Sequence, residues 1–483
     1  MKVAVIGACL GGLAAALRLQ GAGHEVTVLD RRHGPGGRAY QLKDGGYTWD
    51  TGPSLITMPW VLEETFAAGG LDLGREVTMR PLDPFYRIFW AGEERSLDFS
   101  GDREAMKAGI ARFSTRDAAA FDGFMEALRP IYEKGILAAG RQPFLRPRDL
   151  ARFLPTMLYL RAAEPLSYFV ARHFEHPRVR EAFSFHSLFI GGDPHRVPAI
   201  YGALVYLQIT EGVWYTDGGT YSLVEAMART LDVRAGVEVE AIEHSAGQVR
   251  GVRLAGGERI RADVVVSNAD VLTTHELVGR RAPLRPLRPT MSCFLLFLGT
   301  DRPFPKLLHH TLLVGGGYRD FITKVTRGYE MPETFSTYVH APARTEPGMA
   351  AAGGDSLYVL LPVPNLRAEI DWGVAARELR HALVRDFETT FGLEGLDASV
   401  RVEHTMTPED FRTELGAVDG NAFSVEPTLH QSAYFRQPNR DRALAGLYFV
   451  GAGTHPGAGI PGVLLGAEVT TKLIEEDRAA LAA

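Results

Sequence analysis

Three glycines and one aspartate near the start of the chain have types and spacing suited to holding a phosphate group. Gly7, Gly11 and Gly12 follow an apolar run over residues 2–6, and Asp30 ends a second apolar run. Glycines let a backbone approach a pyrophosphate closely, and a carboxylate about twenty residues further along accepts hydrogen bonds from ribose hydroxyls. These residues therefore predict dinucleotide binding. Asp30 favours an unphosphorylated ribose, as in FAD or NAD rather than NADP.

The flanking sequence predicts the elements that position these residues. Residues 2–6 and 25–29 are short and mainly apolar, which is typical of buried parallel strands. Residues 13–20 are rich in alanine and leucine and stop at Gly21, as a helix would. In such a βαβ unit the N-terminus of the helix presents unpaired N–H groups and a partial positive charge to the pyrophosphate.

Cys9 stands where the dinucleotide-binding pattern has its middle glycine. A side chain at this position is expected to crowd the pyrophosphate, so we predict that binding is weakened but not abolished. The alternative is a small buried side chain whose Cβ points away from the ligand.

A second glycine turn, Pro35-Gly36-Gly37-Arg38, follows shortly after Asp30. It would bring backbone N–H groups and a guanidinium close to the pyrophosphate and ribose. An NAD-binding domain does not need such a turn, whereas flavoproteins similar to amine oxidases and carotenoid desaturases carry one. The sequence therefore indicates FAD as the cofactor.

Composition narrows the classes of function. The 483 residues are 46% hydrophobic and 23% charged, with a net charge of −6, so nucleic-acid binding is not expected. Cys9 and Cys293 lie in unrelated contexts, so we expect neither a disulfide nor a metal site, which suits a reducing cytosol. No signal peptide and no apolar run of about eighteen residues is seen, although attachment to a bilayer surface stays open.

The middle of the chain predicts a long helical stretch and an antiparallel sheet. Residues 102–129 read as helical, with Asp117 as the N-cap of the second half. Phe321–Val325, Ser336–His340 and Ser356–Leu361 read as strands of a sheet on the substrate side.

The end of the chain returns to the cofactor. Residues 451–462 form a loop with five glycines, followed by a helix over Val463–Glu475 whose N-terminus would stabilise negative charge on a flavin. His455 in this loop is either a proton carrier or, as we favour, a residue that packs or orients the loop.

These elements predict an α/β protein with a discontinuous Rossmann-like FAD-binding domain, an antiparallel-sheet substrate domain and a helical cap. The predicted ranges are 1–80, 212–285 and 440–483 for the FAD-binding domain, 81–142 and 286–439 for the substrate-binding domain, and 143–211 for the cap. The apolar stretch 150–160 of the cap is either a buried helix or a membrane-facing patch that admits an oily substrate.

The chain resembles the bacterial carotenoid desaturases over nearly its full length. The matching stretches are 34–38, 50–53, 182–188, 212–220, 267–271, 422–427 and 450–463. The resemblance implies an amine-oxidase-type fold and an FAD enzyme that inserts double bonds into a long C40 polyene of the phytoene type. It also implies peripheral attachment to the cytoplasmic membrane, in which such a substrate dissolves. Asp30 departs from the family, which usually has glutamate there.

The resemblance also implies the site residues. The FAD contacts carried over by position are Gly7, Gly11, Gly12, Asp30, Gly37, Arg38, Gly52, Pro53, Val239, Gly451 and Val463. An acid/base role proposed in the family for an aspartate falls here on Asp149, with Arg152 one helical turn further on. A helix N-cap after Pro147 is the alternative for Asp149, and we favour it on the residues alone.

The expected chemistry is transfer of a hydride to flavin N5 and loss of a proton to a base. The proton becomes labile once an allylic cation forms, so a modest base is enough. A hydrocarbon offers no hydrogen bonds, so recognition would rest on shape and apolar burial.

Several alternatives stay open at this point. The substrate could be a later, hydroxylated or C30 carotenoid, and oxygen or quinone could reoxidise the flavin. Another flavin oxidase of the amine oxidase type, or a non-catalytic escort protein that binds prenyl groups, would have the same architecture. The oligomeric state is not predicted.

Overall fold

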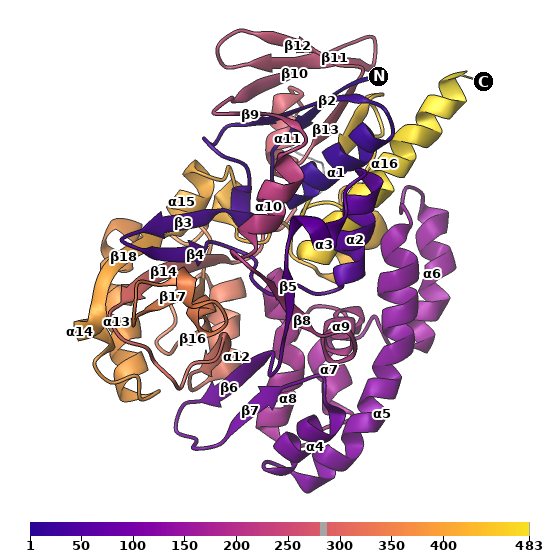
Figure 1. Ribbon diagram of the computed structural model, residues 1–483. Coiled ribbons are helices and arrows are strands. Elements are labelled where there is room, and N and C mark those ends of the chain that lie inside the picture. The colour runs from indigo at the N-terminus through magenta and orange to yellow at the C-terminus, as the bar shows by residue number, and fades with distance from the viewer. Residues whose placement is uncertain (281–286, 483) are drawn as a thin grey trace.

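The computed structural model describes residues 1–280 and 287–482 and contains two large sheets and a group of helices (Figure 1). A parallel sheet lies near both chain ends, and a larger sheet lies beside a group of helices at the opposite end (Figure 1). The predicted domain boundary at residues 285 and 286 lies outside the described residues.

The smaller sheet has five parallel strands in the order β19-β13-β1-β2-β9. Its strands are β1 (Lys2–Ile6), β2 (Glu25–Asp30), β9 (Asp232–Ala235), β13 (Val264–Ser267) and β19 (Leu447–Phe449). Strand β1 pairs on one side with β2, through Val3 and Val26, and on the other with β13, through Val3 and Val264. Segments from the beginning, middle and end of the chain thus build the predicted Rossmann-like sheet.

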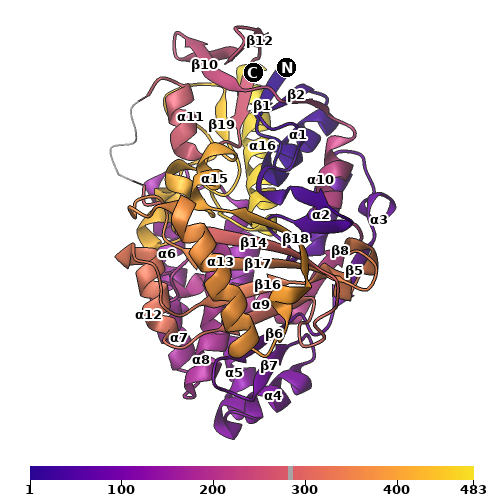
Figure 2. The same cartoon turned by 90° about the vertical axis from the view of Figure 1, so that its left-hand side faces the viewer.

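The first and last helices pack against each other beside this sheet. Helix α1 (Leu10–Gly21) follows the first glycine turn, and α16 (Ile460–Ala482) closes the chain. Figure 2 shows the two chain ends at the same end of the molecule. Three more helices belong to this half: α2 (Pro59–Ala68), α3 (Leu73–Glu76) and α10 (Tyr221–Ala228).

Smaller sheets flank the parallel one. Strands β10 (Val239–Ser245), β11 (Gln248–Leu254) and β12 (Arg259–Arg261) form an antiparallel three-stranded sheet. The paired ribbons are β3 (Gln41–Asp44) with β4 (Tyr47–Asp50) and β5 (Met79–Leu82) with β8 (Val213–Thr216). Helix α11 (Val271–Leu277) follows β13.

The larger sheet has seven strands in the order β18-β14-β17-β16-β15-β6-β7. They are β6 (Tyr86–Trp90), β7 (Ser96–Phe99), β14 (Ser292–Thr300), β15 (His310–Val314), β16 (Ser336–His340), β17 (Asp355–Val363) and β18 (Val400–Met406). The predicted antiparallel sheet is confirmed, except that β15 and β6 run parallel. Helix α13 (Trp372–Thr389) lies over one face of the sheet, and α14 (Leu396–Ser399) and α15 (Pro408–Thr413) complete this region (Figure 2).

One predicted strand is wrong. Phe321–Val325 does not join the sheet, because residues 318–323 form helix α12 (Tyr318–Thr323). Tyr318, Phe321, Ile322 and Val325 are all buried. Their spacing is that of one helical face, and this period decides over the local β propensity.

Helices α4 to α9 form the third region. They are α4 (Arg103–Ala111), α5 (Thr115–Ile131), α6 (Pro147–Tyr159), α7 (Leu166–Ala171), α8 (Pro177–Ser184) and α9 (Ala203–Glu211). The prediction that Asp117 is an N-cap is wrong, because the N-cap of α5 is Ser114. The buried Asp117 carboxylate instead accepts backbone N–H bonds from Glu175 and His176 at 2.9 and 2.8 Å, so it ties α5 to the start of α8.

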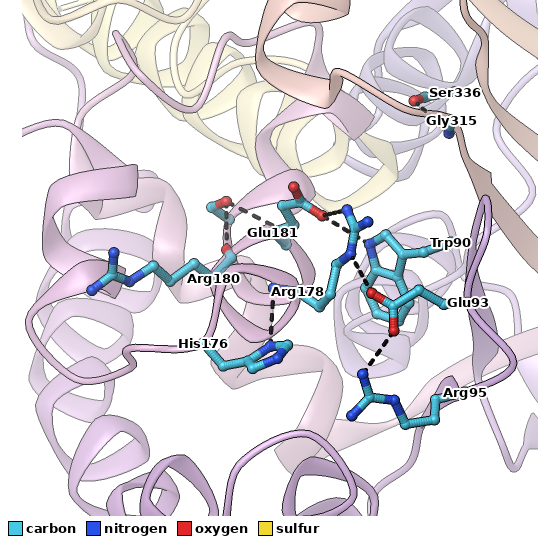
Figure 3. A network of polar contacts seen from close by, with 10 residues as sticks. Trp90, Glu93, Arg95, His176, Arg178, Arg180, Glu181, Gly315 and Ser336 are labelled. Atoms are coloured by element: carbon cyan, nitrogen blue, oxygen red, sulfur yellow. Dashed lines mark hydrogen bonds and ion pairs between the residues drawn. The ribbon is translucent and has the colours of Figure 1, made fainter.

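A network of polar side chains fastens this helical region to the edge of the larger sheet (Figure 3). Glu93, in the turn after β6, accepts from Arg178 Nε at 3.0 Å and from Arg95 at 2.9 Å. Glu181 of α8 accepts from Trp90 Nε1 at 2.9 Å and from Arg178 Nη1 at 3.0 Å. The helices are therefore held at a fixed distance from the sheet.

Candidate functional site

The first glycine turn is held closely against its own strand. Gly7 has φ +95°, a left-handed conformation that disfavours a side chain. A Cβ on Gly12 would lie 2.0 Å from the Gly7 carbonyl oxygen, so helix α1 can approach β1 only with glycine at this position. Gly12 thus acts in helix–strand packing, the role of the third glycine in the dinucleotide-binding pattern.

Asn268 and Gly451 complete the cradle around this turn. A Cβ on Gly11 would lie 2.9 Å from Asn268 Oδ1 and 3.2 Å from Gly451 Cα. Asn268 follows β13, and Gly451 follows β19, so three strand ends converge here. Parallel α/β sheets bind ligands at the carboxyl ends of their strands.

Asp30 lies at the end of β2, as predicted, and is buried. Its Oδ2 accepts the Ala8 N–H at 2.7 Å and its Oδ1 accepts the Arg32 N–H at 2.9 Å. The carboxylate therefore shapes the glycine turn itself. Each oxygen keeps a second lone pair for the ribose contact that the sequence predicts.

The second glycine turn packs directly onto the first. The Gly36 N–H donates to the Ala8 carbonyl at 2.8 Å, and Gly37 has φ +53°. Arg38 Nη2 donates to the backbone and side-chain oxygens of Asn421 at 3.3 Å each. Arg38 Nε is buried and has no hydrogen-bond partner among the described residues. A buried donor of this kind needs an acceptor, and a phosphate or carbonyl oxygen of a dinucleotide would supply one.

Cys9 lies between the two turns and is half-buried. Its backbone has φ −84° and ψ 170°, an extended conformation open to any residue. A Cβ on Gly37 would lie 3.0 Å from the Cys9 Cβ, so this side chain packs toward the second turn. Cys9 also lines the cavity described below, so the crowding prediction and its alternative, a Cβ that points away from the ligand, both stay predictions.

One continuous cavity of about 860 Å³ joins the glycine cradle to the larger sheet and the helices. Every predicted cofactor residue except Gly12 lines it: Gly7, Gly11, Asp30, Gly37, Arg38, Gly52, Pro53, Val239, Gly451 and Val463. The loop before α16 contributes a long stretch of the wall, up to the first residues of the helix. The N-terminus of α16 therefore faces the cavity, where its unpaired N–H groups would stabilise a negatively charged ligand.

The two ends of this cavity differ sharply in polarity. All carboxylates among its described lining residues belong to the cradle end, on Asp30, Glu238, Asp270 and Glu414. The other end is lined mainly by apolar side chains of the larger sheet and of the helical region. Among them are Phe153, Leu154, Met157, Phe185, Leu188, Phe189, Leu204, Leu295, Leu312 and Leu360.

Asp149 and Arg152, the predicted catalytic residues, are not among the described residues that line the cavity. Asp149 lies in the first turn of α6, and its Oδ2 accepts the N–H groups of Leu145 and Arg146 at 3.1 and 2.8 Å. Arg152 is exposed. The N-cap of α6 is Arg146 and not Asp149, but the Asp149 side chain caps the first turn from the third helical position, while its part in catalysis stays a prediction.

The alternative that residues 150–160 form a buried helix is wrong for helix α6. Only Met157 of its residues is buried, and Leu154, Leu158 and Tyr159 are 44%, 62% and 84% exposed. Its inner side lines the cavity through Phe153 and Leu154. The helix thus presents apolar side chains to the cavity and to the outside of the molecule.

His455 lies in the cavity wall beside Phe144, with ring centroids 4.9 Å apart. Its Nε2 bonds the Ala139 carbonyl at 3.1 Å, so Nε2 carries the proton and Nδ1 is left with a lone pair. Burial lowers the pKa of His455 to about 4. This contact ties the glycine loop to the helical region, which agrees with a loop-orienting role.

Sequence reasoning missed a cluster of three buried histidines in the larger sheet, where β15 begins and β16 ends. One ring nitrogen from each of His309, His310 and His340 lies within 4.8 Å of the others, a spacing that could hold a metal ion. Burial lowers the pKa of His309 to about 3, and burial together with the neighbouring histidines lowers the pKa of His310 well below its usual range. The cross-strand pair His310–His340 would have revealed the cluster, had the strand register been known.

Comparison with known proteins identifies the relatives of this chain. Residues 10–470 match the protein family described as flavin containing amine oxidoreductase. The chain is 40% identical to a lycopene-forming phytoene desaturase of Pseudescherichia vulneris, over 99% of both chains. It is 35% identical to a zeta-carotene-forming phytoene desaturase of Myxococcus xanthus, over 98% of this chain and 93% of the relative.

Solved structures share the fold at low identity. An oxidoreductase from Methanosarcina mazei matches with a TM-score of 0.63 and 18% identity, over 98% of this chain and 100% of the other. Putrescine oxidase bound to putrescine matches with a TM-score of 0.66 and 13% identity, over 99% of both chains.

Proposed function

The chain belongs to the flavin-containing amine oxidoreductase family, and on this premise we propose that it desaturates a long-chain carotenoid precursor of the phytoene type. It is an FAD-dependent oxidoreductase. Its relatives of 35–40% identity are named phytoene desaturases and differ in product, being lycopene-forming or zeta-carotene-forming. The observation that carries the proposal is the single cavity that joins a dinucleotide cradle to an apolar, carboxylate-free end.

The residues of the cradle fit FAD. Gly7 and Gly11 allow close approach of the pyrophosphate, Arg38 offers its unpartnered Nε, and Asp30 has lone pairs left for the ribose. We further propose contacts through Gly37, Gly52, Pro53, Val239, Gly451 and Val463, all of which line the cavity. When bound, FAD supplies the hydride acceptor of the reaction.

The apolar end of the cavity would bind the hydrocarbon by burial alone. A polyene has no groups that accept or donate strong hydrogen bonds, so each buried CH₂ contributes roughly 0.8 kcal/mol through the hydrophobic effect. Aromatic side chains such as Phe185 and Phe189 in this wall would orient the chain by shape. The closed wall would also exclude water from the reacting carbons.

The alternative substrate of an amine oxidase, a cationic amine, is disfavoured by the same wall. Among its described lining residues, the end of the cavity at the larger sheet has no carboxylate to pair with an ammonium group. A buried charge without a partner is strongly unfavourable. A hydroxylated or C30 carotenoid would fit the same apolar wall and stays an alternative.

We propose that the protein attaches to the cytoplasmic membrane surface through helix α6. Within the described residues, no helix is long and apolar enough to cross a bilayer. The exposed Leu158 and Tyr159 of α6, together with Tyr168 of α7, could enter the headgroup region. Substrate would then pass from the bilayer into the adjoining cavity, and quinone or oxygen would reoxidise the flavin.

Expression in a phytoene-accumulating host, followed by pigment chromatography, tests the proposed reaction. We expect phytoene to be replaced by more unsaturated carotenoids, and the purified protein to show an oxidised-flavin spectrum. Unchanged phytoene with bound flavin would contradict the substrate, and absence of flavin would instead favour the escort-type binder. In a liposome flotation assay, Leu158→Glu should reduce membrane binding, whereas the exposed Val374→Glu on α13 should not.

A further inference from the structure

A chain of hydrogen-bonded side chains starts in the cavity wall and leads away from it. Ser54 Oγ lies 2.6 Å from Tyr338 Oη, and Tyr338 Oη lies 2.7 Å from His310 Nδ1. Ser54 and Tyr338 both line the cavity, whereas His310 is fully buried behind it on the neighbouring strand. His455 is the one histidine among the described wall residues, and its Nδ1 has no hydrogen-bond partner to which a proton could pass.

The protonation states set which group donates in each of these hydrogen bonds. Burial raises the pKa of Tyr338 far above its usual range, so its hydroxyl stays protonated. With Ser54 donating to Oη, the Tyr338 hydroxyl donates to His310 Nδ1, and the ring proton of His310 sits on Nε2. One lone pair of Oη is then free on the cavity side. This phenol can take up a proton only while it passes its own proton to the imidazole.

A second set of polar contacts lies beside His310. His340 Nε2 lies 3.1 Å from His309 Nε2, and His309 Nδ1 lies 2.6 Å from Thr345 Oγ1. Thr345 is half-buried and lies two residues from the exposed Pro347. The His310 ring stacks on the His340 ring with centroids 5.1 Å apart, and its Nε2 has no hydrogen-bond partner among the described residues. His310 therefore sits in a buried polar cluster, where its hydrogen bond to Tyr338 is the contact that reaches the cavity wall.

We propose that Tyr338 is the catalytic proton acceptor of the desaturation, and that His310 takes up the proton that the Tyr338 hydroxyl gives up. This inference rests on the proposed function. After a hydride leaves one substrate carbon, a C–H bond on the neighbouring carbon breaks, and its electron pair becomes the second bond of the new C=C. The proton joins Tyr338 Oη as the original Oη proton moves to His310 Nδ1. The hydride carries the two electrons to the flavin cofactor, which is the oxidant.

A weakly basic relay is sufficient for this step. A proton next to a carbocation is very acidic, so a base needs no raised pKa to remove it. His310 Nδ1 already faces the Tyr338 hydroxyl at 2.7 Å, so its lone pair is in place to take the proton.

The chain contains a matched control for Tyr338. Tyr86 is also buried, and its Oη lies 2.7 Å from His186 Nε2, but Tyr86 is not among the described cavity-lining residues. We expect Tyr338→Phe to slow phytoene conversion by the holoenzyme in liposomes at least roughly 100-fold, the lower end for general acid–base catalysis. Tyr86→Phe should leave the rate unchanged, and both variants should retain their flavin.

His310→Asn separates relay from packing. Its amide oxygen can still accept from Tyr338, but it cannot carry a proton onward. We therefore expect a loss similar to that of Tyr338→Phe. The wild-type rate should also fall in D₂O, because protons on Tyr338 and His310 move during the step, and this solvent isotope effect should disappear in Tyr338→Phe.

A readout independent of turnover comes from NMR of holoenzyme with ¹⁵N-labelled histidine. One histidine should show an unprotonated, hydrogen-bonded Nδ1 whose signal moves in Tyr338→Phe and not in Tyr86→Phe. Tyr338→Phe as fast as Tyr86→Phe would overturn the proposal. So would a stoichiometric metal ion lost on His310→Asn, since its coordination would occupy the lone pairs that the relay needs. A wild-type protein that leaves phytoene unchanged would overturn the proposed function itself.

Discussion

The two ends of the cavity hold their ligands by opposite means. At the cradle end, backbone N–H groups, glycines and charged side chains are fixed by mutual hydrogen bonds. The Ala8 N–H donates to the Asp30 carboxylate, and the Gly36 N–H donates to the Ala8 carbonyl. At the other end the wall is apolar, and its few polar groups, such as Tyr338, face a network behind the sheet. On the proposed function, the cradle end selects its ligand through directed polar contacts, whereas the other end selects its ligand by shape.

The largest effect on flavin binding and stability is expected from a substitution of Gly12 at the cradle end. Gly12→Ala would place a Cβ 2.0 Å from the Gly7 carbonyl oxygen, so the cradle must distort. We expect loss of bound flavin and a fall of about 3 kcal/mol in the free energy of unfolding, measured in urea. The control is Gly123→Ala on α5, where a Cβ would contact nothing within 4 Å. It should stabilise the protein by about 0.5 to 1 kcal/mol. Equal stabilities for the two variants would contradict the packing role of Gly12.

Arg38→Met tests whether a charged group is needed at the cradle end. Loss of a charge-assisted hydrogen bond is worth about 1.5 to 3 kcal/mol, so FAD affinity should fall roughly 10- to 100-fold in titrations of the flavin-free protein. Arg152→Met, on the exposed side of α6, should leave the affinity unchanged. An unchanged affinity in Arg38→Met would mean that backbone groups alone hold the cofactor.

Asp149→Asn distinguishes helix capping from catalysis. Because the carboxylate accepts two backbone N–H bonds and lies outside the described cavity wall, and an asparagine oxygen can accept the same bonds, we expect unchanged turnover and a stability change below about 0.5 kcal/mol. Asp102→Asn, at the N-cap of α4, should change the stability equally little. A turnover reduced 100-fold with full flavin content would instead place Asp149 in the mechanism.

The smallest effect is expected at Cys9. Since its side chain packs against Gly37, we expect Cys9→Gly to change the FAD dissociation constant by less than about threefold, or below roughly 0.7 kcal/mol. Fluorescence titration of the flavin-free variant checks this. A tenfold gain in affinity would restore the interpretation that Cys9 crowds the pyrophosphate.

The cradle could be predicted because its signals are local. Glycines at fixed spacing, a strand before them and an acid after the next strand lie within thirty residues, and the physics of the turn requires these types. The closing loop was equally readable from its five glycines, of which Gly462 lies inside α16, because the helix begins at Ile460 and not at Val463. Gly12 packs helix α1 against β1, and its contact with FAD stays a prediction.

The other end of the cavity depends on long-range pairing that no local pattern reveals. His310 and His340 face each other only because β15 and β16 pair in one register, and Ser54 reaches Tyr338 from far along the chain. The error at Phe321–Val325 is of a different kind, because the buried positions 318, 321, 322 and 325 already carried a helical period.

The central strand of the parallel sheet, β1, is made first, but two of the groups around its glycine turn are made much later. Asn268 follows β13, and Gly451 follows β19, near the end of the chain. A ribosome must therefore release almost the entire polypeptide before the nucleotide cradle can close. We expect cofactor incorporation to be a post-translational event, and truncation before β19 to yield chains that never acquire flavin colour.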